Sequence, residues 1–127
     1  MEKIQDMDLR KMLLELEEKL QRVYGNKLKA VILYGSVARG TATEESDIDI
    51  MVLIDGTAQE LRTFEDQLSD VSADISIKYF KVFSIMDISY QEYMRWMNML
   101  PFYRNVSQEG VVLYAALYKN TFCISFG

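Results

Sequence analysis

The stretch GSVARGTATEESDIDI, residues 35–50, separates two segments with the character of strands. Before it, residues 28–34 (LKAVILY) are short, rich in β-branched side chains and nearly all apolar, as in a strand buried on both faces. At its end, residues 47–54 alternate acidic and apolar side chains and then run into MVLI, which predicts a second strand that enters the core. A Gly-Ser turn at the end of one strand and two aspartates at the start of the next define the candidate site.

The two aspartates, Asp47 and Asp49, are separated by one residue. Alternate residues of a strand point to the same face, so the two carboxylates start about 7 Å apart at the backbone and can converge on shared ions. Like charges this close repel each other unless a cation lies between them. Mg²⁺ commonly combines one or two carboxylates with substrate phosphates, so the pair suits a nucleoside triphosphate.

Gly35 and Ser36 are the candidates for phosphate binding. Glycine lets a phosphate approach the backbone without a β-carbon in the way, and Ser36 adds a hydroxyl donor at the start of a helix, where amides favour anions. Arg39 on the same helix could contact a phosphate or an acidic partner, and a solvent-facing or capping position fits it equally well. Phosphate at one end of the stretch and metal at the other indicate a site for phosphoryl transfer.

A third acid is expected if an ion must also bind the attacking hydroxyl, and Asp74 is the candidate. Ile75, Ile77 and Tyr79 alternate with polar residues and predict a strand over about residues 73–80, which could lie beside the second strand. Two ions about 4 Å apart would then brace an in-line displacement, one at the acceptor oxygen and one at the leaving pyrophosphate. Asp74 could also receive the proton of the acceptor.

Three amphipathic helices are expected around these strands. Apolar residues recur every three or four positions over residues 9–23, and a Thr-x-x-Glu capping box begins a helix over about residues 57–68. A further helix over about residues 86–100 is expected to end at Pro101. A short final strand is expected in VVLYAALY, residues 111–118.

Composition narrows both the class of protein and the chemistry. A length of 127 residues, half of them hydrophobic, predicts one domain over residues 1–127 with one sizeable core. The net charge of −5 argues against a direct interaction with nucleic-acid backbone. The absence of histidine excludes imidazole acid–base chemistry and leaves carboxylates as the reagents. A single cysteine and the lack of a signal peptide or membrane span predict a soluble, cytoplasmic protein without membrane contact.

The pattern of Gly-Ser, ten further residues and Asp-x-Asp resembles the nucleotidyltransferase superfamily typified by DNA polymerase β. The neighbouring VARGTA and SDID, and the late segment PFYRNVSQEGVVLY (residues 101–114), are most similar to the minimal nucleotidyltransferases, which are the antitoxins of HEPN toxin–antitoxin modules. The resemblance covers about residues 28–114, the motif-bearing core. It implies an α+β nucleotidyltransferase fold, in which helices flank a mixed sheet.

Carried over position by position, the resemblance assigns roles to five residues. It implies that Gly35 and Ser36 bind the triphosphate, that Asp47 and Asp49 bind both metals, and that Asp74 binds the metal nearest the acceptor. ATP is then the substrate, and two Mg²⁺ ions are the cofactors.

Small size and the resemblance together imply the acceptor. A chain this short has little room for a second domain to hold an acceptor, so AMP is expected on a tyrosine of a partner HEPN ribonuclease toxin, with an oligomer of the two proteins as one form. Two alternatives stay open. One is transfer to a small molecule such as an aminoglycoside, and the other is a non-catalytic antitoxin that binds its toxin through the apolar region of Tyr93, Trp96, Met97 and Met99. No function is assigned to residues 119–127.

Overall fold

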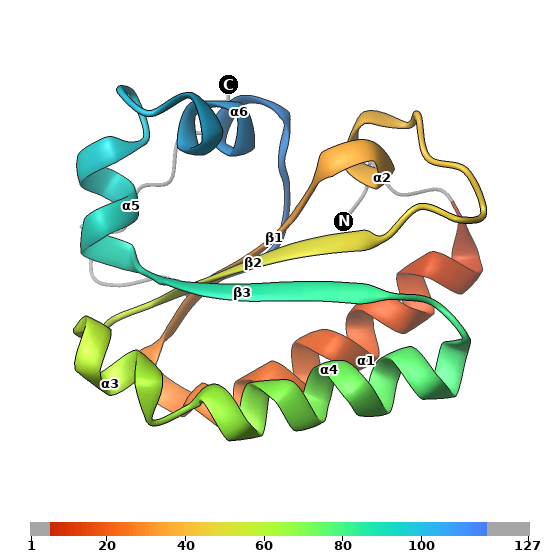
Figure 1. The fold of residues 1–127 in the computed structure, drawn as a ribbon, viewed down its shortest axis with the longest axis horizontal. Helices are drawn as coiled ribbons and strands as arrows, with labels where there is room; N and C mark the ends of the chain where they lie inside the picture. The colour runs from red at the N-terminus through yellow and green to blue at the C-terminus, as the bar shows by residue number, and fades with distance from the viewer. Residues whose placement is uncertain (1–5, 117–127) are drawn as a thin grey trace.

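A four-stranded sheet forms the centre of the computed structural model, which describes residues 6–116. The strands are β1 (Leu28–Tyr34), β2 (Ile48–Ile54), β3 (Phe83–Ser89) and β4 (Val111–Ala115). Their order is β3-β2-β1-β4; β1 is antiparallel to β2 and β4, and β2 is parallel to β3. The expected α+β fold with a mixed sheet is confirmed (Figure 1).

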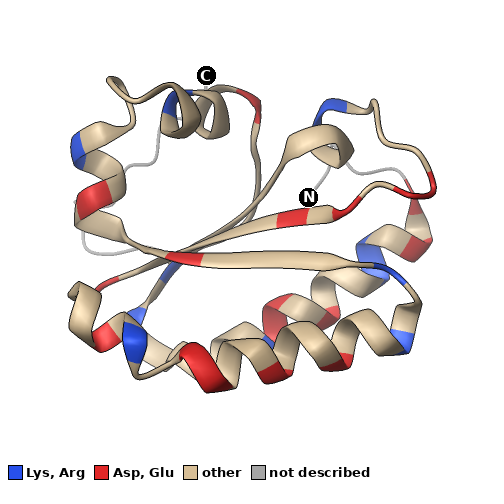
Figure 2. Ribbon diagram, viewed as in Figure 1, with Lys and Arg blue, Asp and Glu red and all other residues tan. Residues whose placement is uncertain are grey.

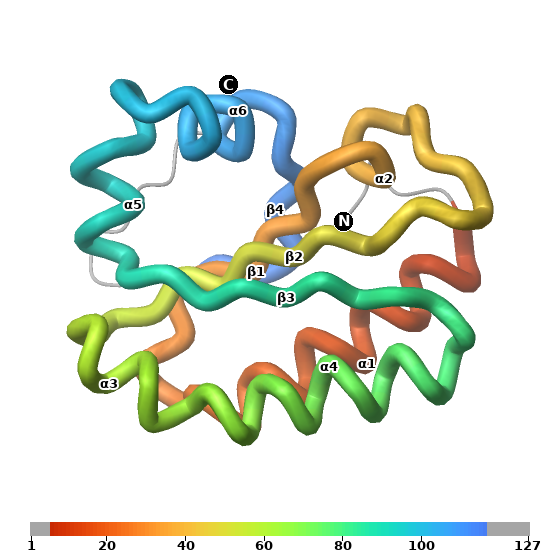
Figure 3. Tube along the Cα trace, in the orientation of Figure 1, coloured from red at the N-terminus to blue at the C-terminus, as the bar shows by residue number. Residues whose placement is uncertain are grey.

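Helices cover both faces of this sheet (Figure 1). The longer helices α1 (Met7–Tyr24) and α4 (Glu65–Tyr79) pack together on one face. On the other face lie α5 (Tyr90–Trp96) and α6 (Pro101–Glu109). The tube in Figure 3 shows that the connection from β1 to β2 lies beyond the end of the sheet away from α5.

Short helical segments complete the structure. A 3₁₀ turn at Gly25–Lys27 follows α1, while α2 (Gly35–Arg39) follows β1 directly. The segment α3 (Ala58–Arg62) starts with the predicted capping box, since Thr57 and Glu60 exchange side-chain to backbone hydrogen bonds. The single helix expected over residues 57–68 is instead divided, because α3 ends at Arg62 and α4 begins at Glu65.

Alternation along the central strands sorts the apolar side chains into two clusters, one on each face. Ile50 and Val52 of β2 pack with Leu16 and the other buried residues of α1 and α4. Met51, between them, packs with the fully buried Tyr93 of α5. The position of a residue in this alternation therefore decides which face of the sheet its side chain reaches.

The strand predicted over residues 73–80 is wrong, because this segment belongs to α4. Besides the alternation of Ile75, Ile77 and Tyr79, the segment carries a helical spacing, since Leu68, Val71, Ile75 and Tyr79 all pack on the α1 side of the core. Ile77, in contrast, is 72% exposed. The strand that lies on the other side of β2 from β1 is β3, which overlaps the start of the helix expected over residues 86–100.

The late helical region also differs from the expectation. Pro101 begins α6 instead of ending the preceding helix, because a proline at the first helical position removes only an amide that has no helical partner. The apolar surface expected around residues 93–99 is largely core: Tyr93 and Met97 are buried, whereas Met99 is 67% exposed. The final strand is confirmed over Val111–Ala115, and its last two expected residues lie outside the described part.

Across residues 6–116, none of the helices has both the length and the apolar composition needed to cross a membrane.

Substitution of two isoleucines on α4 tests the helical assignment of this segment. Ile75→Ala should lower the free energy of unfolding by about 2–5 kcal/mol, because Ile75 is fully buried. Ile77→Ala, the matched change two residues away, should alter it by less than about 0.5 kcal/mol. Urea unfolding followed by circular dichroism measures both. Equal losses would favour the strand, in which the two side chains share one face.

Candidate functional site

Antiparallel pairing of β1 and β2 places the Gly-Ser turn beside the aspartates. Tyr34, the last residue of β1, is the register partner of Asp49. Gly35 follows Tyr34 at once and starts α2, so residues that are fourteen positions apart in the sequence meet across two neighbouring strands. The pairing of the two strands thus builds the site.

Gly35 has two separate reasons to be glycine. Its φ is +76°, a left-handed conformation that side chains with a β-carbon rarely adopt. In addition, a β-carbon built on Gly35 would overlap the Oδ2 atom of Asp49. The carboxylate of Asp49 therefore lies directly against the backbone of the turn, in the place that a side chain would fill.

The aspartates give the site an excess of negative charge (Figure 2). Asp47 is exposed and Asp49 is partly buried. Burial raises the pKa of Asp49, the neighbouring charge of Asp47 raises it further, and Arg39 lowers it. Burial and the charge of Asp49 likewise raise the pKa of Tyr34. A cation bound between the two carboxylates would relieve this repulsion.

Arg39 is the cationic residue of α2 and faces the same region. It pairs with Glu109 at the end of α6, with 3.5 Å between Nη1 and Oε2, and both side chains are about half exposed. An exposed pair of this kind contributes little to stability. The pair links α2 to the end of α6, and the positive charge of Arg39 also acts on Asp49.

Asp74 does not join the other site residues. It is exposed on α4, which packs on the face of the sheet that carries Ile48 and Ile50. Asp49 lies between these two isoleucines in β2, so its side chain points to the opposite face. The structure brings together Gly35, Asp47 and Asp49, and it leaves Asp74 on the other side of the sheet.

Sequence reasoning missed Ser84 and Met86 of β3, which lie on the same face as Asp49. Ser84 is the register partner of Asp49 in the parallel β2–β3 pair, and Met86 accepts a 3.5 Å hydrogen bond at its Sδ atom from the Tyr34 hydroxyl. The alternation of FSIMDIS could have revealed both residues, had this segment been assigned as the strand beside β2.

The side chains that could hold a metal are Asp47 and Asp49. Among residues 6–116, no three His, Cys, Asp or Glu side chains gather closely enough to hold an ion by themselves. Mg²⁺ needs few carboxylates when substrate phosphates supply further oxygens. The two aspartates therefore fit an ion that arrives with a phosphate group.

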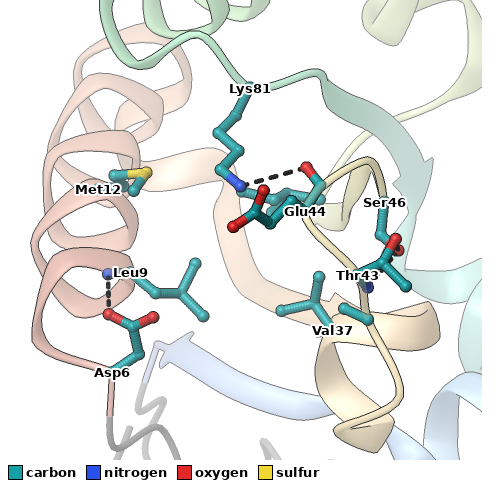
Figure 4. A pocket seen from close by; sticks show the side chains of 10 residues that line it. Asp6, Leu9, Met12, Val37, Thr43, Glu44, Ser46 and Lys81 are labelled. Atoms are coloured by element: carbon teal, nitrogen blue, oxygen red, sulfur yellow. Dashed lines mark hydrogen bonds between the residues drawn. The ribbon is translucent and has the colours of Figure 1, made fainter.

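A pocket of about 290 Å³ lies behind the loop that leads to Asp47 (Figure 4). Its walls come from the start of α1, from Val37 and from residues 42–48. Ser46 and Ile48 line the pocket, but Asp47, which lies between them in the sequence, does not. Lys81 reaches across it and donates a 3.4 Å hydrogen bond to the carbonyl oxygen of Glu44. The pocket therefore does not contain the acid pair. Lys81 contacts the loop before Asp47 from the pocket side.

Two glycines with the same backbone conformation separate the roles of Gly35. Gly35→Ala and Gly40→Ala should each cost about 1–2 kcal/mol of stability for a left-handed φ, since the angles are +76° and +77°. Only Gly35→Ala should also displace Asp49, because a β-carbon on Gly40 meets no atom within 4 Å. Unfolding free energy and Mn²⁺–nucleotide affinity measure the two effects. Equal losses of nucleotide affinity in the two variants would contradict the contact with Asp49.

Comparison with known proteins finds a matching family and two similar proteins from one organism. Residues 15–116 match the family described as "Polymerase beta, Nucleotidyltransferase". A Methanocaldococcus jannaschii protein named "Putative protein adenylyltransferase MJ0604" is 35% identical over 108 residues, which are 85% of this chain and 100% of the relative. A second protein of that organism, "Putative protein adenylyltransferase MJ0141", is 31% identical over 75 residues, 58% of this chain and 72% of the relative.

Two solved structures share the fold. One is described as "Crystal structure of the toxin-antitoxin with AMP-PNP"; it has a TM-score of 0.54 at 19% identity, and the match covers 84% of this chain and 73% of the other. The second is a crystal structure of a doubly substituted form of the toxin–antitoxin MntA-HpeT, with the same TM-score and coverage at 17% identity.

Proposed function

This chain belongs to the polymerase β nucleotidyltransferase family, and we propose that it moves AMP from ATP to a tyrosine of a HEPN-domain toxin, in a magnesium-dependent reaction, and so acts as an antitoxin. The observation that carries the proposal is the contact between the Gly35 backbone and the Asp49 carboxylate. It unites the turn expected to bind phosphate and the acids expected to bind metal in one small site.

Each residue of the site has a part in holding ATP. Ser36, partly buried at the second position of α2, offers a hydroxyl donor to a phosphate oxygen. Arg39 offers a cationic group on the same short helix. Asp47 and Asp49 would hold Mg²⁺, which neutralises phosphate charge when it is bound.

The transfer itself exchanges one phosphorus–oxygen bond for another. The phenolic oxygen of the acceptor forms a bond to the α-phosphorus, and the bond from that phosphorus to the β-bridging oxygen breaks. Pyrophosphate leaves with the electron pair, and the phenolic proton passes to solvent. The task of the protein is to position ATP and to balance its charge, which is how phosphoryl transfer is mainly catalysed.

A protein acceptor is supported by the relatives and by the described structure. The curated relatives are named as protein adenylyltransferases, and the structural neighbours are toxin–antitoxin complexes, one of them with AMP-PNP. Exposed apolar side chains also lie between α5 and the start of α6, namely Met99, Leu100 and Phe102. Phe102 stacks edge-on against Tyr34, the register partner of Asp49, so a toxin bound there would lie beside the site.

Replacement of either aspartate tests the reaction. Asp47→Asn and Asp49→Asn should each reduce AMP transfer roughly a hundredfold or more, because the cation loses a charged ligand. The protein is incubated with Mg²⁺, α-labelled ATP and the toxin encoded by the adjacent gene, and the intact mass of the toxin is then measured. The expected product is a gain of one or more AMP units.

Asp74→Asn is the matched control, because the same chemical change falls on an exposed acid of α4. This variant should transfer AMP at the rate of the unaltered protein. Two results would contradict the proposal. The toxin could be neutralised without gaining labelled AMP, or both aspartate variants could neutralise it as well as the unaltered protein does. Either result would mean that neutralisation occurs by binding alone.

The pair formed by Arg39 and Glu109 allows a separate test of phosphate binding. Arg39→Ala should weaken ATP binding roughly tenfold, the worth of a hydrogen bond to a charged group. Glu109→Ala should leave the affinity equal or higher, since it frees the guanidinium from its carboxylate partner. Isothermal titration with ATP and Mg²⁺ measures both Kd values. Equal weakening in the two variants would mean that the pair only positions α2.

A further inference from the structure

The face of the sheet that carries the site has an acid on β2 and a serine on β3. Asp49 lies on this face, with Asp47 just before the start of β2, and the next strand places Ser84 beside Asp49 in register. Ser84 is exposed, whereas its neighbours Phe83 and Ile85 pack into the cluster on the opposite face. The side chain beside Asp49 on the parallel strand is therefore a neutral hydroxyl.

The other acids of this region cannot replace a carboxylate at that position. Asp87 follows Ser84 by three residues and so points to the opposite face, where its Oδ2 atom accepts a 2.9 Å hydrogen bond from the Tyr24 hydroxyl. Asp74 lies on α4 beneath the same opposite face. Glu109, at the end of α6, pairs with Arg39.

These residues fit one ion and do not fit two. An ion that bridges a triphosphate obtains most of its oxygen ligands from phosphates and water, so one or two carboxylates are enough. A second divalent ion about 4 Å away would be repelled by the first, and protein carboxylates usually offset that repulsion. Asp47 and Asp49 would already bind the ion that carries the nucleotide. The hydroxyl of Ser84 adds no negative charge for a second ion.

We propose that Ser84 limits this site to one divalent ion bound with the nucleoside triphosphate, and that the acceptor hydroxyl must therefore be acidic in its own right. The inference rests on the proposed function for the identity of the acceptor. A tyrosine hydroxyl has a pKa of about 10, far below that of water. A phenol can thus release its proton without a second ion, whereas an aliphatic hydroxyl is a poor acceptor at this site. Ser84 is a specificity-determining residue in this view.

Counting bound ions tests the proposal without any transfer. The full chain is dialysed to equilibrium against Mn²⁺ and α,β-methylene-ATP, an analogue that cannot release AMP, and retained Mn²⁺ and nucleotide are both measured. The unaltered protein should retain one Mn²⁺ per nucleotide. Ser84→Asp should retain two, and Ser84→Asn, a neutral change of similar size, should retain one.

The outcomes separate this inference from the proposed function. Two Mn²⁺ ions per nucleotide in the unaltered protein overturn the inference, whether or not AMP is transferred, and this count is valid even if Ser84→Asp fails to fold. One ion per nucleotide together with no labelling of the toxin upholds the ion count and overturns the proposed function.

The acceptor preference has its own measurement. A toxin in which the acceptor tyrosine is replaced by serine should remain unlabelled by the unaltered protein, while Ser84→Asp should gain transfer to that serine by roughly a hundredfold, the usual effect of assisted proton removal. Labelling of the serine by the unaltered protein at a rate within about tenfold of the tyrosine rate would overturn the phenol requirement.

Discussion

Antiparallel pairing of β1 with β2 is the constraint on which the site depends. With Tyr34 opposite Asp49, the chain must leave β1 at the point where the acids enter β2. The turn can then pass the Asp49 carboxylate only if its first residue has no β-carbon, a condition that Gly35 meets. The same pairing also forms the centre of the core, since alternating residues of these two strands belong to the apolar clusters on the two faces. The register of β1 and β2 therefore determines both the site and the core.

The central strands could be predicted well because their signals are local. Residues 28–34 form β1 with the expected bounds, since a continuous apolar run is what a strand covered on both faces requires. In residues 73–80 the apolar side chains fit two spacings, one of two residues, as in a strand, and one of nearly four residues, as in a helix. Packing against α1 favours the helix. β3 was missed for a related reason, because an edge strand buries few side chains and its pattern is correspondingly weak.

The same contrast explains what could be predicted of the site. Gly35, Ser36, Asp47 and Asp49 lie within one stretch of sequence, so their spacing was informative before any fold was known. The place of a third side chain depends on which strand pairs with β2 and in what register. A strand over residues 73–80 would place Asp74 in this position, whereas the observed strand places Ser84 beside Asp49. Long-range pairing of this kind is not encoded by local propensity.

The close fit of Gly35 and Asp49 also sets a limit on side-chain length at position 49. Because the carboxylate occupies the space next to the glycine backbone, an acid with one more methylene would carry its oxygens into the turn or force the turn to move. Charge alone is thus insufficient at this position. The backbone of residue 35 limits how far the acid may extend, so the reach of the carboxylate at position 49 is determined by a residue that has no side chain.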